Sequence, residues 1–125
     1  MENNWKQKNL DNLEKDTWTS SPNDTNLVKR CTELRKLPLN QFTTEDLRIM
    51  IGQRIGLKYL IPLALETLFN DLFVEGNFFE GDLLQNVLKI DTKFWNENKK
   101  YWQELNNLIK DRRNEIAARR IDIAK

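Results

Sequence analysis

Three carboxylates lie close together in the middle of the chain, at Glu75, Glu80 and Asp82. Paired carboxylates can perform acid–base catalysis when their surroundings separate their pKa values. No lysine, histidine or tyrosine is placed in the sequence to complete such a mechanism, and Asp82 is also expected to cap a helix. We therefore predict that the chain is not an enzyme and has no catalytic residues.

The chain contains no histidine and a single cysteine, Cys31. Histidine is the commonest general base and the commonest metal ligand, so its absence argues against zinc and Cys–His chemistry. Gly76 and Gly81 flank the acidic loop, but the Walker spacing and its terminal Lys-Ser or Lys-Thr are missing. We predict no metal, no cofactor and no small-molecule substrate.

Basic residues gather near the C-terminus, on what the sequence predicts to be one helix. They are Lys110, Arg112, Arg113, Arg119 and Arg120. Such an arrangement could track nucleic-acid phosphates. Acidic residues are interleaved with them, at Asp111, Glu115 and Asp122. An ion-paired, solvated face is the favoured interpretation, and a nucleic-acid-binding module is the alternative.

Charge is divided along the chain. Residues 41–91 carry eight acidic and four basic groups, a balance of −4, whereas residues 92–125 carry nine basic and five acidic groups, a balance of +4. Phe78 and Phe79 are adjacent in the acidic part, within a polar loop, so at least one ring is expected to be exposed. Exposed aromatic rings flanked by acids predict a surface for a basic protein partner. The alternative is that both rings pack on the core.

Length and composition indicate an ordinary globular protein. A chain of 125 residues normally forms one domain and buries roughly two-thirds of its unfolded surface. The longest apolar-rich segment, residues 59–65, is far shorter than the roughly 20 residues that span a bilayer. We expect a cytoplasmic protein without membrane contacts, and the lone Cys31 agrees with a reducing compartment.

Apolar residues recur with helical spacing along almost the whole chain. This pattern predicts an all-α fold, a compact single-domain bundle of about five to seven helices over residues 1–125. We expect an N-terminal helix and loop over residues 1–23, a core over 24–110 and an Arg-rich helix end over 111–125.

The first helix is expected over residues 2–15 and a loop over 19–24. Asp24 or Thr25 can cap the next helix, which should end near Leu37 because a proline follows. Its buried face is predicted to hold Leu27, Cys31 and Leu34.

The best-specified helix start is at Thr43. Thr43 and Asp46 form a capping-box pattern, with Phe42 and Leu47 placed as the hydrophobic staple. This helix is expected to end at Gly56, where glycine tolerates the left-handed conformation. Its inward residues are predicted to be Leu47, Met50 and Ile51.

Pro62 suits the first turn of the following helix, because its missing N–H would have no partner there. We expect this helix to be the central one. Its buried stripe is predicted to hold Leu65, Leu68, Phe69 and Leu72. Another side is predicted to present Glu66, Thr67, Asn70 and Asp71.

Residues 74–81 are expected to form a connecting loop. Asp82 and Gln85 then make a variant capping box that predicts the start of the next helix. Asp91 can cap a further short helix.

Several motifs extend over roughly residues 27–105. They are Leu34–Lys36, Pro38–Leu39, Phe42–Gln53, Ile55–Leu57, Tyr59–Glu66, Glu75–Gly76 and Gly81–Leu84. Together they resemble the bacterial contact-dependent growth inhibition (CDI) immunity proteins. The resemblance implies a small cytoplasmic helical protein that binds and neutralises the toxin domain at the C-terminus of a large exported surface protein.

The chain departs from that family's pattern in two places. The loop reads Asn77-Phe78-Phe79-Glu80 where Asp, two Tyr and Pro would be expected before the Gly-Asp pair. The C-terminus is short and rich in arginine. We interpret the loop change as adaptation to a particular toxin.

These observations together predict an immunity protein whose partner is the cognate toxin domain. We expect this toxin to be a nuclease. The immunity protein would neutralise the toxin by occluding the active or substrate-binding site. The predicted toxin-binding residues are Glu66, Asn70, Asp71, Glu75, Phe78, Phe79, Glu80 and Asp82.

Overall fold

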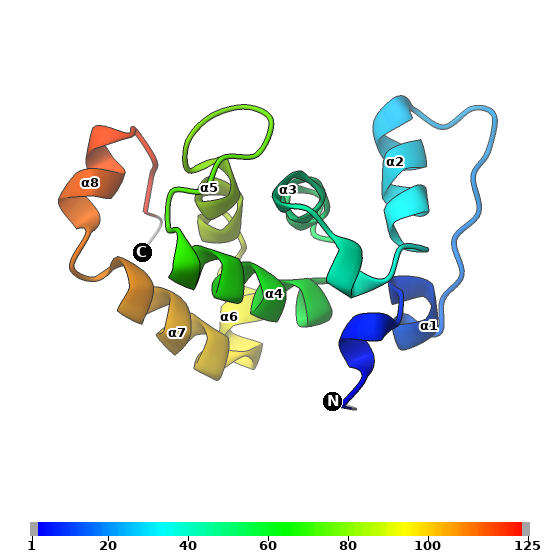
Figure 1. The fold of residues 1–125 in the computed structure, drawn as a ribbon, viewed down its shortest axis with the longest axis horizontal. Coiled ribbons are helices and arrows are strands. Elements are labelled where there is room, and N and C mark those ends of the chain that lie inside the picture. The colour runs from blue at the N-terminus through cyan, green and yellow to red at the C-terminus, as the bar shows by residue number, and fades with distance from the viewer. Residues whose placement is uncertain (1–2, 124–125) are drawn as a thin grey trace.

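The computed structural model describes residues 3–123, and they form an all-α fold, as the helical spacing predicted. These residues contain eight α-helices and two short 3₁₀ helices, η1 and η2 (Figure 1). Their bounds are η1 Trp5–Gln7, α1 Leu10–Glu14, α2 Asn26–Leu34, η2 Leu39–Gln41, α3 Thr44–Gly52, α4 Leu57–Asn70, α5 Asp82–Leu88, α6 Thr92–Glu97, α7 Lys99–Ile109 and α8 Arg113–Ala118. The number of α-helices exceeds the predicted five to seven because several of them are very short.

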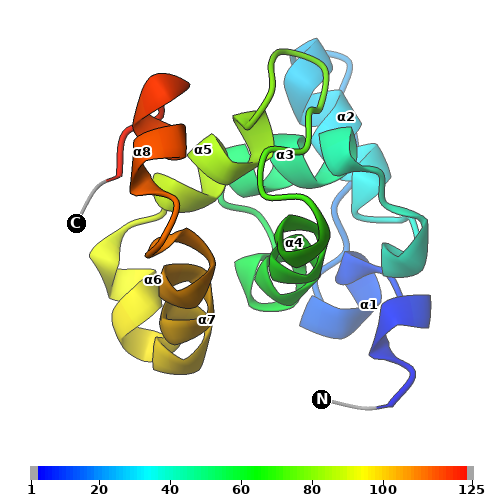
Figure 2. The ribbon, with the colours of Figure 1, turned by 60° about the vertical axis from the view of Figure 1, so that its left-hand side comes forward.

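The helix α4 lies in the middle of the fold, with α3 and α5 on one side and α6 and α7 on the other (Figures 1 and 2). Its buried residues are Leu60, Ile61, Ala64, Leu65 and Leu68. Burying one leucine side chain stabilises a protein by roughly 1.5–3 kcal/mol, so α4 contributes strongly to the core. Within residues 3–123, no helix is both long and apolar enough to cross a membrane.

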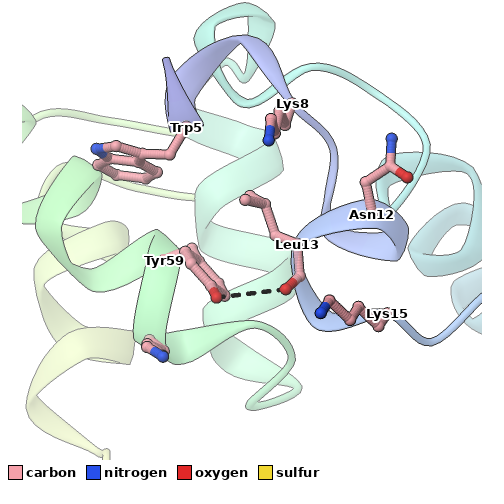
Figure 3. Close-up of a pocket in the computed structure, with 7 residues that line it drawn as sticks. Trp5, Lys8, Asn12, Leu13, Lys15 and Tyr59 are labelled. Atoms are coloured by element: carbon pink, nitrogen blue, oxygen red, sulfur yellow. Dashed lines mark hydrogen bonds between the residues drawn. The ribbon is translucent and has the colours of Figure 1, made fainter. Parts of the chain in front are cut away.

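The N-terminal elements pack against α4. The rings of Trp5 and Tyr59 have centroids 6.2 Å apart, and the Tyr59 hydroxyl donates to the Leu13 carbonyl at 3.4 Å (Figure 3). Leu10 in α1 is buried, and so is Ile121 near the other end of the chain. Both belong to the same cluster of buried apolar residues. We therefore propose that residues 3–123 form one domain.

Three predicted helix starts are confirmed. The Thr25 side chain accepts from the backbone N–H of Val28 at 3.2 Å and caps α2. Thr43 and Asp46 form the full capping box at the start of α3. Asp91 accepts from the N–H of Phe94 and caps α6.

The N-terminal helix expected over residues 2–15 is wrong. The chain forms η1 and α1 instead, separated by Lys8 and Asn9, and the Asn9 side chain accepts from the N–H of Asn12 to cap α1. A competing cap therefore starts a new helix. Position 2, the expected beginning, lies outside the described residues. The helix α2 also ends earlier than predicted, at Leu34 rather than near Leu37.

The junction between α3 and α4 differs from the prediction. The helix α3 ends at Gly52, and Arg54 adopts the left-handed conformation, with φ of 59°. Gly56, with φ of 67°, begins α4 instead of ending α3. Pro62 consequently lies inside α4. The carbonyl that loses its N–H donor there belongs to Lys58, an exposed residue.

Two apolar residues that were predicted to be buried are exposed. Leu27, in the first turn of α2, is 43 % exposed, and Phe69, near the end of α4, is 78 % exposed. Cys31 and Leu34 on α2 are buried as expected. Periodicity gives the angular position of a side chain on a helix, but neighbouring elements decide how much of the apolar stripe is covered.

The single C-terminal helix predicted from the sequence is wrong. A turn at residues 110–112 separates α7 from α8. This turn redirects the chain, so that Ile116 and Ile121 are buried in the core. One straight helix would have carried these residues away from the protein at about 1.5 Å per residue.

Candidate functional site

Residues 74–81 form a loop between α4 and α5, as predicted, and it projects beside α3 and α5 (Figure 1). An antiparallel bridge between Glu75 and Glu80 closes its base. The N–H of Gly81 donates to the Phe73 carbonyl at 3.1 Å. Gly81 has a φ of 91°, which a residue with a side chain rarely adopts. The 74–81 loop is thus closed by its own backbone.

Asp82 fixes this loop from inside. Its carboxylate is 2 % exposed and accepts from the backbone N–H groups of Gly76, Phe78 and Phe79 at 2.7, 3.0 and 3.3 Å. The predicted capping box with Gln85 is wrong, because Gly81 occupies the N-cap and Asp82 is the first residue of α5. Asp82 makes its hydrogen bonds to the loop and not to its own helix.

The charge of Asp82 is stabilised by this arrangement. Burial by itself raises the pKa of Asp82, but the N–H donors of Gly76, Phe78 and Phe79, together with Arg48, lower it further than burial raises it. The carboxyl group is therefore ionised at neutral pH. A general acid would need a raised pKa, so Asp82 has the properties of a structural anchor.

Two residues of α3 hold the loop from outside. Glu45 accepts from the backbone N–H of Asn77 at 2.8 Å and from the Arg48 guanidinium at 2.7 Å. The hydrogen bond from Arg48 is the main cause of the lowered pKa of Glu45. The Arg48 guanidinium also lies 4.1 Å from the centre of the Phe78 ring. This distance allows a cation–π contact.

The C-terminal segment contacts the base of the loop. Arg119 donates to Glu80 at 2.7 Å, and its guanidinium lies 3.8 Å from the centre of the Phe73 ring. Ile121 packs so closely on Gly81 that a Cβ atom there would be 2.7 Å from its Cδ1. Arg119 and Ile121, which we call the C-terminal clasp, thus tie the end of the chain to the 74–81 loop.

Replacing Arg119 with alanine should loosen the loop with little effect on global stability. The Arg119–Glu80 pair is partly exposed, so we expect a loss of less than about 1 kcal/mol in the free energy of unfolding. Amide hydrogen exchange of residues 75–80 should become about tenfold faster, measured by mass spectrometry. Arg113→Ala, at an exposed arginine that begins α8, the helix before Arg119, is the matched control. If residues 75–80 exchanged their amide hydrogens at the same rate in the two variants, the C-terminal clasp would not hold the loop.

Both phenylalanines of the loop are exposed, Phe78 by 69 % and Phe79 by 39 %. The expectation that at least one ring is exposed is therefore confirmed. Phe78 also lines a groove of about 360 Å³ over α3, and Leu27 of α2 lines the same groove. Sequence reasoning missed Leu27 because it assigned that residue to the core. The adjacent pair Leu27-Val28 was the available signal, since two neighbouring helix positions diverge by about 100°.

The other predicted site residues lie elsewhere. Glu66 pairs with Lys6 at 2.9 Å, and the Asn70 side chain donates to the Glu66 carbonyl. Both line a second groove between α4 and α7. Asp71 accepts from the N–H of Phe73 in the turn after α4. The predicted set is therefore divided between two parts of the surface.

The basic residues near the C-terminus do not lie on one continuous helix. Arg112 precedes α8 and pairs with Glu115, whereas Arg119 follows α8 and pairs with Glu80. Lys110, Arg113 and Arg120 are exposed. Arg112 and Arg119 are therefore ion-paired, as the favoured interpretation of the sequence predicted. Their pairing weakens the alternative of nucleic-acid binding.

The geometry is that of an all-α protein that displays aromatic side chains on an anchored loop. The chain matches the sequence model of the CDI immunity proteins over residues 12–105. This match covers most of the chain, which therefore belongs to the CDI immunity protein family. No curated protein and no solved structure matches the chain significantly. The 74–81 loop lies inside the matched segment, whereas the C-terminal clasp lies outside it.

Proposed function

We propose that the protein binds and neutralises the cognate C-terminal toxin domain of a CDI effector. The observation that carries the proposal is the family match over residues 12–105. The anchored loop gives it a physical basis, because a preorganised surface loses little conformational entropy on binding. The protein would act as a stoichiometric inhibitor and would need no catalytic group.

The toxin-binding surface is proposed to centre on the 74–81 loop. Phe78 and Phe79 are its aromatic anchors, with Glu75 and Glu80 at the base of the loop. Leu27 lines the same groove over α3 as Phe78 and is added to the set. Aromatic residues at the centre of an interface contribute much of its binding energy. A standard interface uses about 20–30 residues on each side, so the rest of this face would surround the anchors.

Four of the predicted toxin-binding residues are placed outside the proposed contact area. They are Asp82, Glu66, Asn70 and Asp71. Asp82 is buried and would act by positioning the loop without touching the toxin. Glu66 and Asn70 line the groove between α4 and α7, so we place them outside the main contact area. Asp71 holds the turn that leads into the loop and is also placed outside it.

The toxin is proposed to be a nuclease with a basic substrate-binding cleft. Residues 41–91 have a charge balance of −4, from eight acidic and four basic groups. Such an excess of acidic groups would steer a basic partner and accelerate association at low salt. The loop would then occlude the cleft that binds nucleic acid.

Replacing Phe78 with alanine is expected to weaken the toxin complex. Loss of a central aromatic anchor typically costs about 2 kcal/mol, which is roughly thirtyfold in Kd. Binding would be measured by calorimetry with the purified toxin domain encoded beside this protein, and neutralisation by rescue of growth on co-expression. Phe78 is largely exposed, so the variant should fold.

Phe69→Ala is the matched control, because Phe69 is also exposed and lies in the other groove. It should leave toxin affinity unchanged. No complex between the wild-type protein and the toxin domain would refute the proposed function. If Phe78→Ala bound the toxin domain normally and Phe69→Ala bound it weakly, toxin binding would stand as the function. The interface would then lie at the groove that contains Phe69 and not at the 74–81 loop.

A further inference from the structure

A groove of about 690 Å³ lies between α4 and α7, and we call it the α4–α7 groove. Figure 2 shows the two helices side by side, away from the 74–81 loop. The lining residues are Pro62, Leu65, Glu66, Phe69, Asn70, Tyr101, Glu104, Asn107 and Leu108. The proposed toxin-binding function does not use this groove.

The groove has an apolar interior. Leu65 is buried, Tyr101 and Leu108 are half-buried, and the Phe69 ring is 78 % exposed. Phe69 has the largest exposed fraction among the exposed large hydrophobic residues of the described chain. Leaving an aromatic ring in water forgoes the stabilisation that its burial would give. A partner that covers Phe69 would gain this stabilisation.

The polar lining of the groove is acidic. Glu66 and Glu104 line it, with Asn70 and Asn107, and none of the lining residues is a lysine or arginine. Glu104 makes no ion pair within residues 3–123. Burial and then the charge of Glu104 raise the pKa of Tyr101. Glu66 pairs with Lys6, but both side chains are well exposed, so this ion pair can exchange for a partner's cation at little cost.

The length of the groove fits a short helix. The residues of α7 that line the groove run from Tyr101 to Leu108, which at 1.5 Å per residue gives about 10 Å, or two turns. Two neighbouring helices with an apolar channel between them can bind an amphipathic helix through residues spaced i, i+3, i+4 and i+7. The two glutamates that line the groove favour Lys or Arg beside that apolar face.

We propose that the α4–α7 groove is a second docking site, and that its partner is an amphipathic helix with an apolar face flanked by lysine or arginine. Phe69 is the central contact, and Glu66 and Glu104 select the basic flanks. The site is separate from the 74–81 loop, so the protein could hold this partner and the toxin domain at the same time.

A pair of synthetic peptides tests the proposal. One is a helix of roughly 14 residues with leucines at i, i+3, i+4 and i+7 and lysines at the flanking positions, and its twin has glutamates instead. We titrate each into ¹⁵N-labelled protein. The basic peptide should shift the amide signals of residues 62–70 and 101–108, and the acidic twin should bind at least about tenfold more weakly.

Variants separate this site from the toxin-binding loop. Phe69→Ala should abolish binding of the basic peptide, and the double variant Glu66→Gln/Glu104→Gln should weaken it and reduce its salt dependence. Phe78→Ala should leave it unchanged. Equal affinity for the two peptides, shifts confined to the 74–81 loop, or no binding would each overturn the proposal. A concentration-dependent dimer that Phe69→Ala dissociates would also overturn it and assign the groove to a second copy of the chain. None of these results depends on whether the toxin domain binds.

Discussion

Replacing Asp82 with alanine is expected to lower the free energy of unfolding by about 3 kcal/mol and to abolish the fixed conformation of the 74–81 loop. The backbone N–H groups of Gly76, Phe78 and Phe79 would lose their shared acceptor. Water can reach part of the opened loop and limits the cost, but it cannot restore the loop conformation. Urea unfolding followed by tryptophan fluorescence would give the stability, and amide exchange of residues 75–80 would report the loop.

Asp91→Ala is the matched control for this prediction. Asp91 is an exposed N-cap whose side chain accepts one N–H, from Phe94, and its loss should cost about 1 kcal/mol. Toxin affinity should fall with Asp82→Ala and stay unchanged with Asp91→Ala. If the two variants lost equal stability and equal loop protection, Asp82 would be an ordinary helix-start residue and not the anchor of the loop.

The same anchor predicts the pH dependence of stability. The pKa values of Asp82, Glu45 and Asp11 are lowered from their ordinary values of 3.8, 4.5 and 3.8. When the pKa of a carboxyl group is lower in the folded state, its ionised form stabilises the fold. This stabilisation is fully present above the unfolded-state pKa and is lost as pH falls through the folded-state pKa. Stability should therefore decline below about pH 4. The decline should be shallower in Asp82→Ala, and an identical pH profile would contradict the assignment.

Replacing Arg35 with methionine is expected to lower the free energy of unfolding by about 3–5 kcal/mol. Arg35 is 1 % exposed and donates to Asp11 and to the Asp16 carbonyl, both at 2.8 Å. Its guanidinium also lies 4.5 Å from the centre of the Trp18 ring. Methionine fills a similar volume, but the buried Asp11 would keep only its second cation, Lys36. Thermal and urea unfolding would measure the loss.

Arg30→Met is the matched control. Arg30 lies on α2, the helix that ends just before Arg35, and its side chain is 49 % exposed. Arg30 also pairs with the buried Asp46, but Asp46 keeps the Thr43 N–H as a donor, so the loss should be about 1 kcal/mol, well below that of Arg35→Met. The double variant Arg35→Met/Asp11→Asn should lose less than the sum of its single changes, because Asp11 and Arg35 interact directly. Additive losses, or equal effects of Arg30→Met and Arg35→Met, would show that the buried pair is not the source of the stability.

The starts of α2, α3 and α6 were predictable from the sequence. Thr25, Thr43 with Asp46, and Asp91 each bond to a backbone N–H three residues ahead. Such contacts lie within one turn, so a short stretch of sequence contains all of their information. Helix ends were less predictable. Gly56 packs on the Leu10 side chain, a contact across 46 positions of sequence that a local pattern cannot reveal.

The candidate site was only partly predictable. The loop followed from composition, and the exposure of at least one of its phenylalanines was predicted because a loop does not easily bury two adjacent rings. The contacts that anchor the loop from outside could not be predicted from the sequence, because they come from residues far away in the chain. Glu45 and Arg48 reach the loop from α3, and Arg119 reaches it from the C-terminus.

The sequence by itself determined the helical class, the starts of α2, α3 and α6 and the CDI immunity family, because these depend on local spacing and on motifs that the chain contains. The tertiary structure alone decided which apolar residues remain uncovered. Leu27 and Phe69 have the spacing of core residues, yet they are exposed, since no neighbouring element covers them. It also decided that Glu66 and Asn70 line one groove and Phe78 another, which divided one predicted surface into two.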